Sequence, residues 1–166
     1  MPVDYVLDYA ELDVRYRKLQ QAVHPDRYVN AGDQERRIAM QQAAQINEAY
    51  TVLKDVTRRG QYLLELAGVD LQFEQRTTQD PAFLMQQMEL REELSQVKQQ
   101  ADPLRSLDEL SQQARGQKKS LELALTTFLQ DKDYSQASET VLKMQFYNRL
   151  LDEMQETEAE LEDGLL

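Results

Sequence analysis

Several residue types are scarce in this chain of 166 residues, and each scarcity excludes a class of protein. Cysteine is absent, which excludes disulfides, zinc–thiolate sites and cysteine nucleophiles. With 1 histidine, a histidine-based metal site or catalytic triad would have to be built around that residue alone. The 5 glycines and 4 prolines are too few for a turn-rich β protein.

Long apolar runs are also missing. No stretch reaches the roughly 18 apolar residues that a membrane span requires. The N-terminus has neither the basic region nor the apolar region of a secretory signal. We therefore expect a cytoplasmic protein without a membrane partner.

Positive charge is scarce as well, with 19 basic residues against 30 acidic ones and a net charge of −11. A broad nucleic-acid surface is not expected, because phosphates are bound by basic fields. The imbalance lies in residues 80–166, which hold 18 acids and 9 bases, whereas residues 15–37 hold six bases and three acids. The sequence therefore predicts a locally basic segment attached to a strongly acidic one.

Helical periodicity and helix-forming residues run through most of the chain and predict an all-α protein. The first helix begins after Asp8, with Glu11 in capping-box position, and ends at His24 because Pro25 disfavours a helical residue before it. The other expected helices cover about 34–54, 58–67, 81–100, 106–130 and 134–163, with Ser106 and Glu109 as a second capping box. We expect a domain over 1–68, a linker over 69–79 and a second domain over 80–166.

The most specific motif is His24-Pro25-Asp26, in the loop between the first two helices. It resembles the J-domain of DnaJ-type co-chaperones, in which this loop and the preceding basic helix bind a 70-kDa heat-shock chaperone. On that resemblance the chaperone-binding residues are His24, Pro25, Asp26, Arg15, Arg17, Lys18 and Arg27. The alternatives are a helix stop with a histidine at the helix C-terminus, an acid–base pair without a pocket, and a metal site without a second ligand.

A second pattern lies in FLMQQMELREEL, residues 83–94. Phe83, Leu90 and Leu94 form a core stripe at helical spacing. Apolar and acidic residues alternate nearly opposite that stripe, namely Leu84, Met85, Met88, Glu89 and Glu92. In the last helix, Phe146 likewise lies nearly opposite the core stripe. Either the first of these helices is buried on two sides, or an exposed binding surface is present with Phe146 as a second anchor.

These motifs together, with QYLLELAGVDL and DPAFLMQQMELREEL, resemble the HscB family of iron–sulfur co-chaperones over almost the whole chain. The resemblance implies an L-shaped, all-α co-chaperone rather than an enzyme, with no cofactor and no metal. It further implies that a J-domain stimulates ATP hydrolysis by an HscA-like chaperone. A C-terminal three-helix bundle would deliver the IscU-like scaffold protein. The implied scaffold-binding positions are Leu84, Met85, Met88, Glu89, Glu92 and Phe146.

The chain departs from the family pattern at two places. At Gln96 the family often carries an acid. Family members also begin with a short helix resembling DYFxLFGLP, so we expect roughly seven or eight residues to be missing upstream and the J-domain core to be underfilled. The functional alternatives are a J-domain co-chaperone for a different client and a helical adaptor without chaperone coupling.

Overall fold

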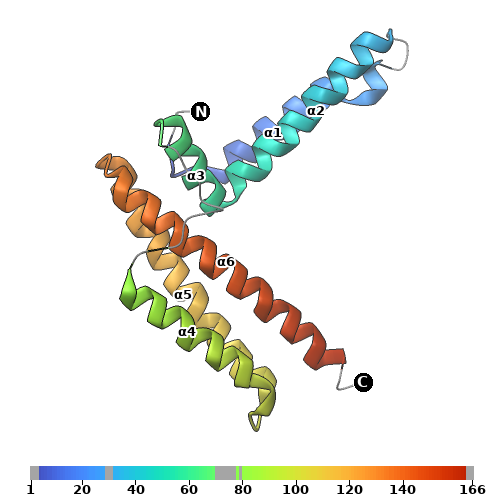
Figure 1. Cartoon of the computed structure of the whole chain (residues 1–166). Coiled ribbons are helices and arrows are strands. Elements are labelled where there is room, and N and C mark those ends of the chain that lie inside the picture. The colour runs from blue at the N-terminus through green and yellow to red at the C-terminus, as the bar shows by residue number, and fades with distance from the viewer. Residues whose placement is uncertain (1–3, 29–31, 70–77, 79, 164–166) are drawn as a thin grey trace. The chain divides into compact units, whose positions relative to one another are not determined.

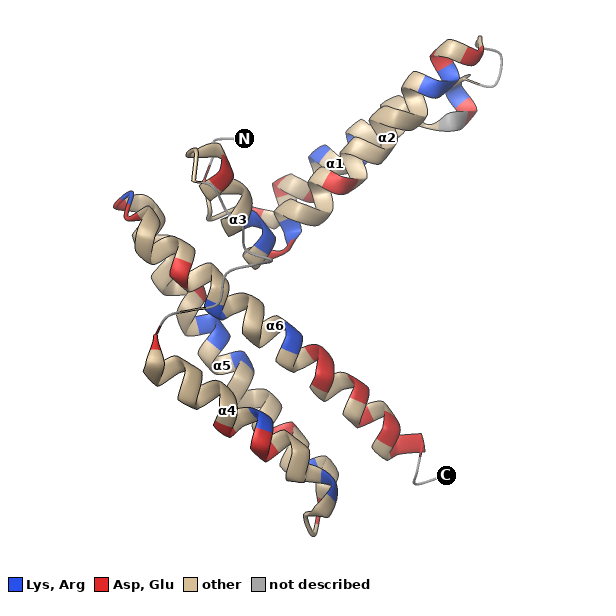
Figure 2. Ribbon diagram, viewed as in Figure 1, with Lys and Arg blue, Asp and Glu red and all other residues tan. Residues whose placement is uncertain are grey.

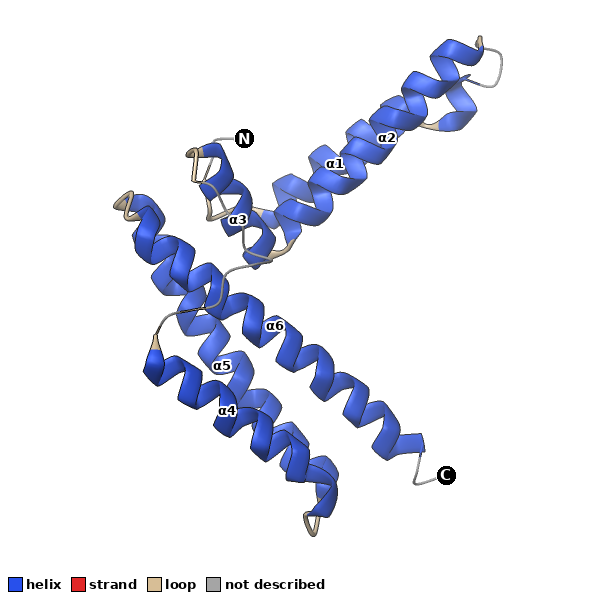
Figure 3. Ribbon diagram, viewed as in Figure 1, coloured by secondary structure: helices blue, strands red, loops and turns tan. Residues whose placement is uncertain are grey.

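The computed structural model describes residues 4–28, 32–69, 78 and 80–163, and every regular element in them is helical (Figures 1 and 3). The elements are α1 (Tyr9–Val23), the 3-10 turn η1 (Pro25–Tyr28), α2 (Asp33–Lys54), α3 (Val56–Leu66), α4 (Pro81–Gln96), the 3-10 turn η2 (Val97–Gln99), α5 (Pro103–Gln130) and α6 (Tyr134–Asp163). The all-α expectation is confirmed. None of the described helices combines the length and the apolar character that crossing a membrane requires.

The chain forms two compact units, Met1–Leu63 and Leu64–Leu166, so the division falls within α3. The domain boundaries expected at residues 68 and 79 stay predictions. Most of the expected linker, residues 70–77 and 79, lies outside the described residues, as do residues 1–3.

In the first unit, α1 and α2 form a hairpin in which tyrosine side chains make contacts between the two helices. The rings of Tyr16 and Tyr50 stack at a centroid distance of 3.9 Å. The Tyr50 hydroxyl donates to the carboxylate of Asp13 at 2.7 Å, and the Tyr16 hydroxyl donates to the Asn47 side chain at 3.0 Å. The hydrogen bond from Tyr50, reinforced by the nearby Lys54, lowers the pKa of the Asp13 carboxyl.

α3 joins this hairpin through the buried side chain of Arg59. Its guanidinium lies 5.0 Å from the ring centre of Tyr5 and 5.6 Å from that of Tyr9. It also donates to the backbone carbonyl of Leu53 at the end of α2. One buried cation thus connects the N-terminal segment, α2 and α3.

The second unit is a bundle of α4, α5 and α6 (Figure 1). Its main core cluster consists of Phe83, Leu90, Val97, Leu107, Leu110, Ala114, Phe146, Tyr147, Leu150 and Met154. Burial raises the pKa of the Tyr147 phenol, because the ionised form loses its hydration.

Two Asp-Pro pairs start α4 and α5. Asp80 accepts from the backbone N–H groups of Ala82 and Phe83, and Asp102 accepts from that of Arg105. The expected capping box at Ser106 is therefore wrong, because Pro103 suits the first turn of a helix and lets α5 begin three residues earlier. The expected end of α4 near residue 100 is also late, since a 3-10 turn follows Gln96.

Candidate functional site

The candidate site of the first unit begins where α1 ends. His24 has φ −59° and ψ 133°, a non-helical conformation that a following proline favours. Residues 25–28 then form a 3-10 turn, in which the Arg27 N–H donates to the His24 carbonyl at 3.0 Å. The side chains of His24 and Asp26 are 56% and 86% exposed. The loop therefore offers both polar side chains to solvent.

The two side chains are coupled through one imidazole nitrogen. The backbone N–H of Asp26 donates to His24 Nδ1 at 3.3 Å, and the same nitrogen lies 3.5 Å from Asp26 Oδ2. A neutral imidazole that accepts at Nδ1 carries its proton on Nε2, where it can donate to a partner. A protonated imidazole instead pairs with the carboxylate.

The rest of the loop folds back onto the end of α1. Arg27 Nη1 donates to the carbonyl of Gln21 at 3.4 Å, and the Tyr28 hydroxyl donates to the carbonyl of Ala22 at 3.3 Å. These carbonyls belong to the last turn of α1, where no helical N–H remains to pair with them. The predicted binding residue Arg27 thus also holds the loop in place.

The predicted basic residues of α1 do not share one face. Arg17 and His24 line the same hollow of about 270 Å³, together with Gln20 and Gln21. Lys18 is exposed, and neither Lys18 nor Arg17 forms an ion pair with a described residue. Arg15 instead pairs with Glu11 at 2.6 Å, so Glu11 does not complete the expected capping box. The structure therefore brings Arg17 and His24 together and separates Arg15 from them.

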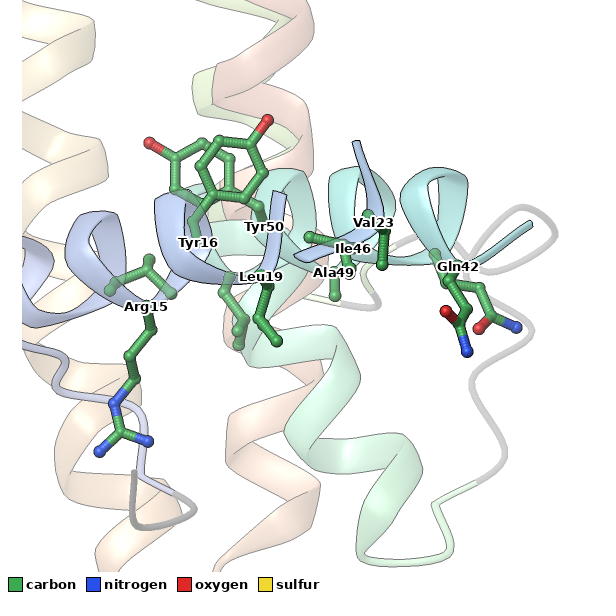
Figure 4. A pocket seen from close by; sticks show the side chains of 11 residues that line it. Arg15, Tyr16, Leu19, Val23, Gln42, Ile46, Ala49 and Tyr50 are labelled. Carbon is green, nitrogen blue, oxygen red and sulfur yellow. The ribbon is translucent and has the colours of Figure 1, made fainter. Parts of the chain in front are cut away.

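Arg15 borders an apolar groove between α1 and α2 (Figure 4). The groove has a volume of about 490 Å³ and is lined by apolar side chains that include Leu12, Leu19, Val23, Ile46, Ala49 and Leu53. The rings of Tyr16 and Tyr50 lie over one another beside it, and the guanidinium of Arg15 extends away from them. The expectation of a missing upstream helix concerns residues outside this chain and stays a prediction.

The second candidate surface lies on α4. Met85 and Met88 are 64% and 73% exposed, and Glu89 and Glu92 are exposed beside them, whereas Leu84 is half-buried. Within the bundle of α4, α5 and α6, the two methionines are therefore not buried. We call these five residues the α4 surface.

Gln96 lies one turn beyond Glu92 and donates to its carboxylate through the side-chain amide. An acid at this position would repel Glu92 instead of donating to it. The amide of Gln96 thus orients the carboxylate of Glu92 through a hydrogen bond.

Phe146 is not exposed, and the expectation of an exposed second anchor is wrong. Its ring is 4% exposed and packs edge-on against Phe83 at 5.6 Å and Tyr147 at 5.3 Å. The physical reason is that α6 contacts both α4 and α5, so two stripes of α6 are buried. The guanidinium of Arg91, a residue that the sequence pattern did not single out, lies 5.8 Å from the Phe146 ring centre. The signal that could have pointed to it is its place seven residues after Leu84, on the same helical face.

Charge also distinguishes the elements. Acidic residues gather along the C-terminal half of α6 (Figure 2). Two of them form ion pairs across the bundle, Glu153 with Arg91 of α4 and Glu160 with Lys98 of η2. The hydrogen bond from Lys98 lowers the pKa of Glu160. Among the described residues, no group of three or more His, Cys, Asp or Glu side chains is placed to hold a metal ion.

Comparison with known proteins finds a match for each part of the chain. The DnaJ domain model matches residues 2–62, and the model described as the HSCB C-terminal oligomerisation domain matches residues 79–155. The co-chaperone HscB homologue of Cupriavidus taiwanensis is 44% identical over 163 residues, covering 98% of this chain and 92% of that protein. The homologue of Vibrio cholerae is 39% identical, with 97% and 94% covered. This chain belongs to the HscB family.

The solved structures of HscB proteins share this fold. The chaperone HscB from Vibrio cholerae matches with a TM-score of 0.86 and 37% identity, covering 100% of this chain and 95% of that one. The human co-chaperone HscB has a TM-score of 0.87 at 24% identity, with 94% and 77% covered, and supports the fold alone. The chain is thus a J-domain co-chaperone of the HscB type.

Proposed function

We propose that this HscB-family chain delivers an IscU-like iron–sulfur scaffold protein to an HscA-like 70-kDa heat-shock chaperone and stimulates ATP hydrolysis by that chaperone. The observation that carries the proposal is that the exposed His24–Asp26 pair and the exposed methionines belong to two different compact units. A protein that brings two partners together needs a binding surface for each of them. This chain has one such surface in each unit.

The chaperone surface combines a shaped loop with positive charge. His24 and Asp26 project from a loop that is held by its hydrogen bonds to the end of α1, so little ordering is needed on binding. Arg17 lines the hollow beside His24 and forms no ion pair with a described residue, although its charge acts on the nearby Asp13 carboxylate. An acidic surface on the chaperone would be steered toward this end of the hairpin.

The α4 surface, which we assign to the scaffold protein, combines exposed apolar side chains with acidic ones. Met85 and Met88 can bury their thioethers against a partner, and methionine adapts to irregular apolar surfaces. Glu89 and Glu92 rim these side chains and favour a basic partner. Phe146 packs against Phe83 of α4 in the interior of the bundle and is not an exposed contact.

The test is the rate of ATP hydrolysis by an HscA-like chaperone, measured with this chain and with and without an IscU-like scaffold. We expect stimulation by the chain alone and a further increase when the scaffold is present. His24→Gln should abolish both effects while leaving the melting temperature nearly unchanged, because the imidazole is exposed.

Two outcomes would contradict the proposal. Stimulation that survives in His24→Gln, together with a large loss of melting temperature, would assign His24 to the core. Stimulation without any scaffold binding would instead indicate a J-domain co-chaperone that serves a different client.

A further inference from the structure

A hollow opens between the three helices of the second unit, on the side of α4 that carries Gln86. Because Gln86 precedes Met88 by two residues, the two side chains lie nearly opposite each other on the helix. The hollow has a volume of about 480 Å³, within the range of small-molecule sites. α4, α5 and α6 all contribute to it, and its apolar wall consists of Phe83, Leu121 and Tyr147. It is thus separate from the exposed methionines, although Glu89 borders both.

Tyr147 brings an unpaired donor to this hollow. The residue is 1% exposed, yet its hydroxyl forms no hydrogen bond with any residue that the structure describes. Hydroxyls this deeply buried are nearly always hydrogen-bonded, as the Tyr50 hydroxyl is to Asp13. Burial raises the pKa of the Tyr147 phenol, so the group stays neutral and keeps its proton. Its O–H is therefore available to an acceptor on a ligand.

The charged groups around the hollow disfavour an anionic ligand. Lys143 Nζ lies 2.7 Å from Asp80 Oδ2 and 5.2 Å from the ring centre of Phe83, and its side chain is 20% exposed. Asp80 thus offsets the charge of Lys143, and Glu89 adds a further negative charge to the lining. A carboxylate or a phosphate would be repelled by this net negative set of groups.

Two side-chain amides complete the lining, those of Gln86 on α4 and Gln117 on α5. Each amide can donate and accept hydrogen bonds without adding charge. The hollow therefore combines an apolar wall, a neutral donor and neutral amides, which suits an uncharged ligand that has both an apolar body and a hydrogen-bond acceptor.

We propose that this hollow is a binding site for a small neutral amide, whose carbonyl oxygen accepts from the Tyr147 hydroxyl and whose apolar body packs on Phe83 and Leu121. A hydrocarbon fits less well, because it would leave the tyrosine donor unpaired. A carboxylate fits less well, because it would face Asp80 and Glu89. The site needs neither the chaperone nor the scaffold protein, so its failure would leave the proposed function untouched.

The first experiment uses the absence of cysteine, which allows one thiol to be placed at a chosen position. Gln117→Cys places it in the lining of the hollow, and Ser120→Cys places it on the same helix outside that lining. Both positions are exposed. Each variant is incubated with a disulfide-linked benzamide and with the matching benzoate, and mass spectrometry measures the captured fraction. The ratio of captured benzamide to captured benzoate should be about fivefold higher at residue 117 than at residue 120.

The second experiment adds Tyr147→Phe, which removes the hydroxyl and keeps the ring. In the Gln117→Cys background it should lower benzamide capture about two- to tenfold, the effect of one neutral hydrogen bond. The melting temperature should stay nearly unchanged, because the hydroxyl has no partner among the described residues. Tyr50→Phe is the matched control, since it removes a hydroxyl that donates to Asp13 in the other unit. It should lower the melting temperature and leave capture at residue 117 unchanged.

Each part of the proposal can fail separately. Equal capture ratios at the two thiols would overturn the site, and capture that survives Tyr147→Phe would overturn the hydrogen bond. Preferred capture of the benzoate would overturn the neutral class of ligand. If Tyr147→Phe does not fold, the unchanged chain is titrated with free benzamide and followed by nuclear magnetic resonance. With a dissociation constant of about 1–10 mM, benzamide should shift the backbone signals of Phe83, Gln86 and Leu121, whereas benzoate should not. Benzamide shifts confined to other residues would overturn the proposal.

Discussion

Phe146 and Met88 are both apolar residues of the second unit, but their environments differ sharply. Phe146 is 4% exposed within an aromatic cluster, and Met88 is 73% exposed on α4. Phe146→Ala should therefore lower the free energy of unfolding by about 3–5 kcal/mol, since it leaves a cavity. Met88→Ala should change the free energy of unfolding by less than about 0.5 kcal/mol. Urea unfolding followed by circular dichroism checks both values.

A Phe146→Ala variant as stable as the unchanged protein would mean that the ring is a surface contact after all. The sequence could not decide this point, because periodicity reveals one apolar stripe and α6 buries two. Ala137, Val141 and Met144 mark the first stripe, and Phe146 belongs to the second, which meets Phe83 of α4. The sequence leaves the exposure of Met85 and Met88 open for the same reason, because apolar residues opposite a core stripe can face either a second buried contact or solvent.

Helix starts could be predicted where a cap and a proline coincide, and α4 is the clearest case. Asp80 caps α4 through the N–H groups of Ala82 and Phe83, and also accepts from Lys143 of α6 at 2.7 Å. The sequence indicates the cap but not the lysine, which is 63 residues away. At α5 the same Asp-Pro signal competes with a capping box at Ser106. The helix begins at the earlier signal, because Asp102 accepts from the N–H of Arg105 and Pro103 fits the first turn.

The pairing of Asp80 with Lys143 predicts a specific pH dependence. The hydrogen bond from Lys143, helped by the N–H of Phe83, holds the pKa of Asp80 below its ordinary value of 3.8. The ionised carboxylate therefore stabilises the folded state above that value, and the contribution is lost as the pH falls through the lower pKa of the folded protein. Asp80→Asn, which keeps a good cap, should be less stable than the unchanged protein at neutral pH. The difference should shrink as the pH falls below 3.8 and through the lower pKa of the folded protein, as measured by urea unfolding at a series of pH values.

Asp102→Asn is the matched control for this experiment. Asp102 caps α5 in the same Asp-Pro arrangement. The cation near it is Arg105 of its own helix, which pairs with Glu109, and no lysine from another helix forms an ion pair with it among the described residues. Its replacement should give a stability difference that changes much less with pH. A constant difference between Asp80→Asn and the unchanged protein from neutral to acid pH would show that the Lys143 contact does not depend on the charge of Asp80.

At the scale of the molecule, the sequence predicts two functional surfaces because its charge and its motifs are divided between its two parts. The basic segment with His24-Pro25-Asp26 lies in the first compact unit, and the α4 surface lies in the second. What the sequence could predict only in part is the three-dimensional grouping within each surface. The grouping of Arg17 with His24 follows from their spacing of seven residues on one helical face, whereas the groove beside Arg15 depends on where α2 packs against α1.

Because each unit contains one of the surfaces, changes in one should leave the other working. Met85→Ser combined with Met88→Ser should weaken binding of an IscU-like scaffold about tenfold or more, since truncating apolar anchors often costs about 1–2 kcal/mol each. Stimulation of the chaperone's ATP hydrolysis in the absence of scaffold should be unchanged. His24→Gln should give the reverse pattern, with scaffold binding kept and stimulation lost.

Leu123→Ser is the matched control for the methionine variant, because Leu123 is an apolar residue of the same unit that is 67% exposed but lies on α5. It should alter neither measurement. Loss of scaffold binding in Leu123→Ser would place the contact on α5, and loss of stimulation in the methionine variant would mean that the two surfaces are coupled. A melting curve for each variant separates these outcomes from unfolding. Because all three side chains are exposed, we expect the melting temperature of each variant to stay nearly unchanged.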